Sequence, residues 1–180
     1  VEVLLNPSLK GKPVIVGGLP HERGVASTAS YEARKYGVHS GMPLRKAYQL
    51  CPQGIFVRGN YHIYSAFSKR LFRVLHQYTP DVEEASLDEA YLDLTRCRPL
   101  YSSFSRTIRE IKNRAEKELG ITVSVGVGPN KLMAKLATNK AKPGGLVEVE
   151  PGEEEKFLKD LGIESLPGIG PKAQVILRML

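Results

Sequence analysis

The feature that most constrains the fold is a hydrophobic pattern whose period changes in the middle of the chain. Over residues 60–78, apolar side chains recur at every third or fourth position, which is typical of one face of a helix: Ile63, Phe67, Leu71, Val74 and Tyr78. Over residues 81–94 the period becomes two, with Ala90, Leu92 and Leu94 alternating with Glu89, Tyr91 and Asp93. Residues 82–85 can form a strand that pairs with this alternating segment across a turn at Ser86, Leu87 and Asp88. This pattern predicts a long amphipathic helix followed by a β-hairpin with acidic residues at its turn.

The rest of the chain continues the mixture of helices and strands. We expect further strands at residues 13–18, 24–29, 121–127 and 146–149, and further helices at 30–36, 43–51, 103–119, 130–139, 153–161 and 172–180. Gly120 is well placed to end the helix over 103–119. This order predicts an α+β fold with an antiparallel or mixed sheet and helices on one face.

Composition narrows the classes of function. The chain has 26 Lys and Arg against 19 Asp and Glu, a net charge of +7, which favours a polyanionic partner without identifying one. Its 42% hydrophobic residues are enough for a packed core. No apolar run approaches the roughly 18 residues of a membrane span, and residues 1–7 have no signal-peptide features, so we expect no membrane partner and an intracellular, cytoplasmic protein. Cys51 and Cys97 lie too far apart to indicate a zinc site.

The predicted hairpin turn carries the strongest candidate for chemistry. Asp88 and Glu89 are adjacent carboxylates beside the turn, and a local distortion there would let both face one metal ion. Hard oxygen ligands suit Mg²⁺, which takes one or two carboxylates together with substrate phosphates. Acids at a turn are also commonly just solvated, and the pattern leaves both interpretations open.

Several basic segments are candidates for phosphate binding. Thr28 lies at a predicted strand-to-helix transition, with Tyr31 about one helical turn further on and Arg34 about two. Lys131 and Lys135 lie four residues apart on one predicted helix, and Lys142 follows. For each group a solvent-facing basic surface is the default interpretation.

Two glycine-containing segments differ in what they indicate. Residues 126–131 begin like a dinucleotide-binding loop, but Lys131 stands where the third glycine belongs. Residues 166–172 place two glycines around one apolar residue between helices, and this arrangement resembles a helix-hairpin-helix clamp on the DNA backbone. An ordinary glycine-rich connection between helices would have the same pattern.

Six motifs occur together in one order over nearly the whole chain: residues 6–13, 29–37, 86–93 (Ser-Leu-Asp-Glu-Ala-Tyr-Leu-Asp), 124–131 (Ser-Val-Gly-Val-Gly-Pro-Asn-Lys), 141–144 and 167–170. With them the sequence resembles the Y-family, or translesion, DNA polymerases, and within that family the bacterial DNA polymerase IV type. The resemblance implies fingers over residues 1–60, a palm over 61–149 and the start of a helical thumb over 150–180. It also implies a low-fidelity enzyme that adds deoxynucleotides to a primer 3′ end by phosphoryl transfer with two Mg²⁺ ions.

The same resemblance assigns roles to individual residues. Asp88 matches the metal ligand of the palm and Glu89 the adjacent catalytic acid, so both are expected at the metal site. The residues expected to bind the incoming triphosphate are Thr28, Tyr31, Arg34 and Lys142. The residues expected to contact DNA are Pro167, Gly168, Ile169, Gly170 and Lys172. The implied partners are primer–template DNA, deoxynucleoside triphosphates and a sliding clamp bound through other regions, and we expect a monomer.

The sequence departs from the family pattern at both ends. Family members begin with a strand that carries a further metal-binding aspartate and an aromatic residue that excludes ribonucleotides, and this sequence begins just past both. The remainder of the thumb and the little-finger domain would follow its last residue. We therefore expect a fragment that does not extend a primer by itself. Two alternatives stay open: a non-catalytic DNA-binding module, which would not need Asp88 and Glu89, and another palm-type enzyme such as a nucleotide cyclase, which would not need the clamp-like turn.

Overall fold

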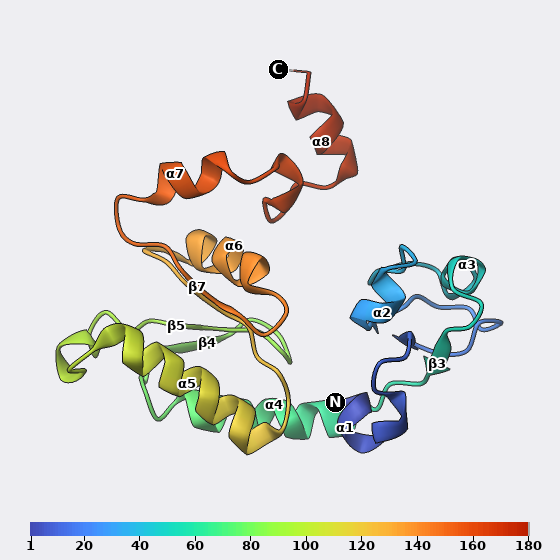
Figure 1. The fold of residues 1–180 in the computed structure, drawn as a ribbon, viewed down its shortest axis with the longest axis horizontal. Helices are drawn as coiled ribbons and strands as arrows, with labels where there is room; N and C mark the ends of the chain where they lie inside the picture. The colour runs from blue at the N-terminus through green and yellow to red at the C-terminus, as the bar shows by residue number, and fades with distance from the viewer. Residues whose placement is uncertain (180) are drawn as a thin grey trace. The chain divides into compact units, whose positions relative to one another are not determined.

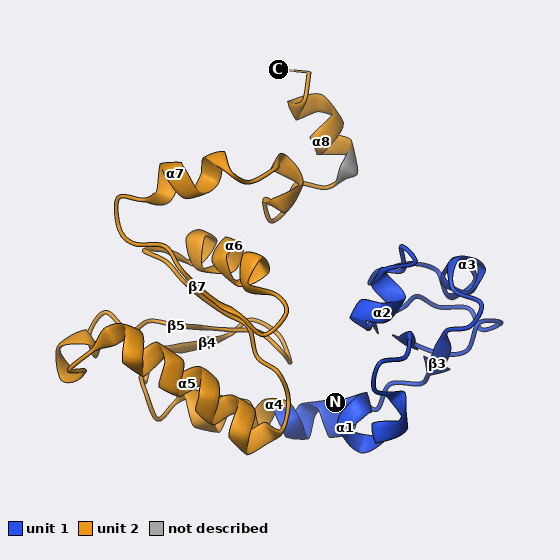
Figure 2. Cartoon of the chain, in the orientation of Figure 1, with its two compact units in different colours: residues 1–67 blue, residues 68–180 orange. Residues whose placement is uncertain are grey.

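The computed structural model describes residues 1–179 apart from Pro171, which enters only as the first residue of the last helix. The chain divides into two compact units, Val1–Phe67 and Ser68–Leu180 (Figures 1 and 2). We describe each unit by itself. No helix within the described residues is both long enough and apolar enough to cross a membrane.

The first unit is built around a small mixed sheet. Its elements are α1 (Glu2–Leu5), the 3₁₀ turn η1 (Pro7–Leu9), β1 (Val14–Val16), β2 (Thr28–Ala29), α2 (Tyr31–Arg34), α3 (Leu44–Leu50) and β3 (Ile55–Val57). β1 is central, antiparallel to β2 and parallel to β3. Of these elements, the sequence pattern did not predict α1, η1 or β3.

β1 separates two apolar clusters because successive side chains of a strand point to opposite faces. Ile15, which is fully buried, packs in a cluster with residues of α2 and α3 that includes Ala33, Leu44 and Ala47. Val14 and Val16 pack on the other face with Leu9, Ile55, Val57 and Tyr64. This packing fixes the β2–α2 junction, where three of the candidate binding residues lie.

The second unit contains most of the helices and two short β-ladders. Its elements begin with α4 (Tyr61–Leu75), which crosses the boundary between the units, and continue with β4 (Val82–Glu84), β5 (Ala90–Leu92), η2 (Arg98–Leu100), α5 (Phe104–Leu119), β6 (Val125–Val127), α6 (Lys131–Ala141), β7 (Leu146–Glu148), α7 (Glu154–Lys159), η3 (Ile163–Ser165) and α8 (Pro171–Leu177). β4 and β5 are antiparallel, whereas β6 and β7 are parallel. The predicted α+β class is confirmed.

One apolar core joins both ladders of this unit to its two long helices. Phe72 and Leu75 of α4 and Ile108 and Ile111 of α5 are buried together, with side chains of all four strands packed against them. The helix α6 packs directly on β6 and β7. α5 ends at Gly120, whose φ of 69° is the left-handed conformation that favours glycine as a helix stop.

Candidate active site

The hairpin turn carries the two predicted acids. β4 and β5 pair Glu84 with Ala90, so the turn consists of residues 85–89. The backbone N–H groups of Ala85 and Ser86 both donate to the carbonyl of Glu89, at 3.0 and 3.1 Å. The hydroxyl of Ser86 donates to Asp88 Oδ1 at 2.7 Å. The Asp88 carboxylate is exposed at the turn, and Glu89 is partly buried next to it.

Two lysines of α6 bind acids of this hairpin. Lys135 Nζ donates to Glu89 Oε1, and the Lys135 side chain is only 25% exposed. One turn earlier, Lys131 Nζ donates to Glu83 Oε2 and lies 5.6 Å from the centre of the Tyr91 ring. Lys131 is exposed, as the expected solvent-facing lysine would be, whereas Lys135 is partly buried; both pair with an acid of the hairpin.

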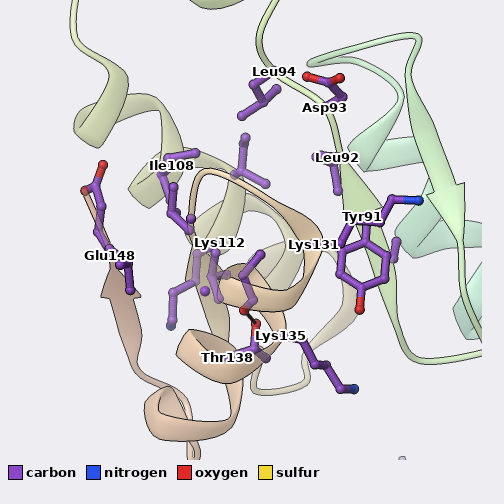
Figure 3. A pocket seen from close by; sticks show the side chains of 18 of the residues that line it. Tyr91, Leu92, Asp93, Leu94, Ile108, Lys112, Lys131, Lys135, Thr138 and Glu148 are labelled. Atoms are coloured by element: carbon purple, nitrogen blue, oxygen red, sulfur yellow. Dashed lines mark hydrogen bonds between the residues drawn. The ribbon is translucent and has the colours of Figure 1, made fainter. Parts of the chain in front are cut away.

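A cavity of about 480 Å³ lies between the hairpin, β6 and α6. Asp88, Glu89, Lys131 and Lys135 contribute to its polar wall, and apolar side chains of β5, α5 and β6 line the rest. Figure 3 shows Tyr91, Lys131 and Lys135 gathered on one side of the cavity, with Glu148 on another. The cavity combines carboxylates and ammonium groups beside a largely apolar interior, which is typical of a binding site.

The donor set at the turn fits a hard divalent cation. Asp88 and Glu89 supply carboxylate oxygens, which Mg²⁺ prefers, and the Asp88 carboxylate is accessible to solvent. Within the described residues there is no group of three or more His, Cys, Asp or Glu side chains arranged for a metal. Two carboxylates suffice where substrate phosphates complete the coordination.

Thr28, Tyr31 and Arg34 come together at the β2–α2 junction. Thr28 pairs with Val16 at the end of the sheet and is exposed, and Tyr31 is 52% exposed in the first turn of α2. Arg34 Nε donates to the carbonyl of Ala29 at 3.0 Å. This bond fixes the guanidinium and leaves its two terminal nitrogens available as donors.

Ser30 connects β1 to α2 at this junction through hydrogen bonds. The sequence analysis did not assign it a role. Its hydroxyl oxygen accepts from Val14 N at 2.9 Å and from Ala33 N at 3.3 Å, and the hydroxyl donates to the carbonyl of Lys12 at 3.1 Å. Ser30 is thus the N-cap of α2 and ties the helix to β1. A serine at the start of a predicted helix is the N-cap signal that could have found it.

Lys142 lies in the second unit, just after α6. It is the C-cap residue of α6 and is exposed, and its Nζ donates to Asn139 Oδ1 at 3.4 Å. It is not among the described residues that line the cavity.

The glycine turn at residues 167–170 connects η3 to α8. Gly168 has φ of 85°, and Gly170 is the N-cap of α8. A Cβ atom at either glycine would meet nothing within 4 Å, so the backbone here is open to close approach. Pro167 is also exposed, Ile169 is partly buried, and Lys172 is exposed in the first turn of α8. The turn thus presents accessible backbone beside a cation.

Gly126 and Gly128 act in packing. A Cβ at Gly126 would lie 2.1 Å from Thr138 N and 2.3 Å from Ala134 O, and one at Gly128 would lie 2.6 Å from Met133 Cβ. β6 therefore lies against α6 at a distance that only glycine permits. Packing accounts for these two glycines, and no dinucleotide-binding role is needed.

Comparisons with known proteins place the chain in a family. The family model described as "impB/mucB/samB family" matches residues 1–139. A protein of Dehalococcoides mccartyi (strain ATCC BAA-2266 / KCTC 15142 / 195) named DNA polymerase IV is 47% identical over 180 residues, which is 100% of this chain and 46% of that protein. A DNA polymerase IV of Listeria monocytogenes serotype 4a (strain HCC23) is 46% identical over 94% of this chain and 48% of its own length.

Solved structures agree with the curated relatives. The crystal structure of DinB from Sulfolobus solfataricus has a TM-score of 0.88 at 42% identity, covering 99% of this chain and 52% of that chain. A structure described as an insertion ternary complex of Dbh DNA polymerase has a TM-score of 0.85 at 42% identity, and the match covers 99% of this chain and 53% of that chain. The chain spans about half the length of the curated relatives that it matches. The resemblance to Y-family DNA polymerases is confirmed, and the chain belongs to the impB/mucB/samB family.

Proposed function

We propose that this chain forms the catalytic part of a template-directed, low-fidelity translesion DNA polymerase. The observation that carries the proposal is the pair Asp88 and Glu89 at a hairpin turn on the wall of a cavity, in a chain whose relatives are named DNA polymerase IV. The reaction would join a deoxynucleotide to a primer 3′ end and release pyrophosphate. Residues 1–60, 61–149 and 150–180 would act as fingers, palm and the start of the thumb.

Asp88 and Glu89 would hold the divalent cations, which we propose are two Mg²⁺ ions. Bound there, the ions would activate the attacking hydroxyl and neutralise charge on the leaving pyrophosphate. Asp88 contributes an exposed carboxylate that Ser86 orients through its 2.7 Å hydrogen bond. Glu89 contributes a second carboxylate, with one oxygen already bound to Lys135.

Thr28, Tyr31, Arg34 and Lys142 would bind the incoming triphosphate. Arg34 offers a planar group of donors that matches phosphate oxygens, and its bond to Ala29 reduces the freedom lost on binding. Thr28 and Tyr31 offer exposed hydroxyl donors beside it. Lys142 adds an exposed ammonium group. Such contacts accelerate phosphoryl transfer by positioning the reacting groups.

The turn at residues 167–170 and Lys172 would contact the backbone of primer–template DNA. Its open glycines permit close approach of phosphates to backbone N–H groups, and the net charge of +7 favours a polyanion. The sliding-clamp partner, the monomeric state and the cytoplasmic location stay predictions from the sequence.

A chimera tests this function directly. The chain would replace the matching residues of the Dehalococcoides mccartyi relative, whose remaining half supplies the regions outside the match. We expect Mg²⁺-dependent addition of the deoxynucleotide complementary to the template base. A chimera that folds and binds primer–template but incorporates nothing would favour the DNA-binding module, and a cyclic nucleotide product would favour a cyclase.

A further inference from the structure

Among the ion pairs of the described residues, the one between Lys135 and Glu89 has both partners on the wall of the cavity. Both residues line the cavity, and Glu89 is the acid proposed to hold a metal. The ammonium group is directly bonded to Glu89 Oε1. The two side chains are 25% and 42% exposed, so water reaches the pair only in part.

Lys131 provides a natural comparison on the same helix face. It lies one turn before Lys135 and pairs with Glu83, also on the hairpin. These side chains are 61% and 57% exposed, and Glu83 is not among the described residues that line the cavity. Thus two lysines bind one hairpin, but only Lys135 binds an acid of the candidate metal site.

A bound ammonium group opposes a metal ion at the same carboxylate in two ways. It occupies an oxygen that would otherwise be a ligand, and it repels a dication nearby. It also restricts the rotamers of a glutamate side chain that would otherwise move freely. The same contact therefore orders Glu89 and competes with the ion.

From this contact we propose that Lys135 is a positioning residue, which holds the Glu89 carboxylate against α6 when no divalent cation is bound and releases it when the cation binds. The proposal rests on the proposed function, because it takes Glu89 as a metal ligand. Metal binding at Glu89 would then compete with the bond from Lys135, which belongs to α6.

The test is a titration of the 180-residue chain with Mn²⁺, whose free-ion paramagnetic resonance signal reports binding without any assay of activity. Mn²⁺ accepts the same oxygen ligands as Mg²⁺. Lys135→Gln should tighten Mn²⁺ binding by about three- to tenfold, because it removes both competition and repulsion. Lys131→Gln makes the same change in net charge and should change the affinity less than about twofold, since exposed charges are screened.

Two further variants make the result specific. Lys135→Arg keeps the cation and should bind Mn²⁺ as the unsubstituted chain does. Lys135→Met, which removes the charge but keeps a long side chain, repeats the test if Lys135→Gln does not fold. Equal affinities of Lys135→Gln and Lys131→Gln, or weaker binding by Lys135→Gln, would overturn the proposal.

Glu89→Gln separates this inference from the proposed function. If it weakens Mn²⁺ binding and removes the effect of Lys135→Gln, both stand. If it weakens binding while Lys135→Gln behaves like Lys131→Gln, the metal site stands and the role of Lys135 is wrong. If it leaves Mn²⁺ binding unchanged, the metal site itself is wrong, and the inference fails with it.

Discussion

Asp88 and Glu89 are neighbours in sequence but have different surroundings. Asp88 is exposed and accepts a hydrogen bond from Ser86, whereas Glu89 is partly buried and bound to Lys135. On a regular strand their side chains would point to opposite faces, but both lie in the turn before β5 begins. Their position could be predicted, since the alternation of apolar residues located the hairpin. The Lys135 contact could not, because it joins residues 46 apart and a pair of lysines four residues apart is also typical of a solvated helix face.

Tyr64 leads to a prediction about pH. Burial, followed by the hydrogen bond that Tyr64 donates to the Glu2 carboxylate, raises the pKa of this phenol from 10 to about 12. A folded-state pKa above the unfolded value gives stability that is complete below pH 10 and is lost as the pH rises towards 12. Urea unfolding across this window should show a steeper loss of stability for the unsubstituted protein than for Tyr64→Phe.

Tyr61→Phe is the control for that experiment. Tyr61 lies on the same helix and is 66% exposed, so its substitution should leave the alkaline slope as in the unsubstituted protein. Equal slopes for Tyr64→Phe and the unsubstituted protein would contradict the stabilising role of the neutral phenol.

At the scale of elements, the long helices were the most predictable part of the fold. The expected helices over 60–78 and 103–119 are found as α4 and α5 with small differences at their ends, because several turns of periodic apolar residues define each. The three-residue β3 is too short to give such a pattern. The expected strand over 121–127 is found only at 125–127, since Val123 N donates to the Glu116 side chain at 2.9 Å rather than to a neighbouring strand.

Close contact between β6 and α6 gives the second prediction. Gly126→Ala would place a methyl group 2.1 Å from Thr138 N, where backbone atoms must shift. Such overpacking typically lowers the free energy of unfolding by about 1–3 kcal/mol. Because the new methyl group would meet two backbone atoms, the loss for Gly126→Ala should be about 3 kcal/mol or more. Gly170→Ala, which has open space and φ of −79°, should change the free energy of unfolding by less than about 0.5 kcal/mol. Denaturant unfolding measures the stability of both variants. Similar free energies of unfolding would contradict the close packing of β6 on α6.

At the scale of the whole molecule, the residues proposed to take part in the reaction are divided between the two units. Thr28, Tyr31 and Arg34 belong to residues 1–67, and Asp88, Glu89 and Lys142 to residues 68–180. The family could be predicted because several specific motifs follow one another in its order. Pairings such as Lys135 with Glu89 depend instead on how distant segments pack, which motif order alone does not specify.

The third prediction concerns nucleotide binding by the chimera. Arg34→Ala and Lys142→Ala should each weaken binding of a deoxynucleoside triphosphate about tenfold or more, because each removes a charge-assisted hydrogen bond. Lys35→Ala, which removes an adjacent exposed cation, should have a much smaller effect. A fluorescent triphosphate analogue measures the affinities, and the corresponding nucleoside should be insensitive to all three. Equal effects of Arg34→Ala and Lys35→Ala would contradict the role of Arg34.

The central claim is that the β4–β5 turn carries the catalytic acids, and single-turnover nucleotide incorporation by the chimera tests it most directly. Asp88→Asn and Glu89→Gln should each slow incorporation by about 10³-fold or more, since the ions that stabilise the transition state would lose a ligand. Glu83→Gln changes an acid of the same hairpin that lies outside the cavity lining, and its rate should stay within about threefold of the unsubstituted chimera. Near-normal incorporation by either Asp88→Asn or Glu89→Gln would contradict the account.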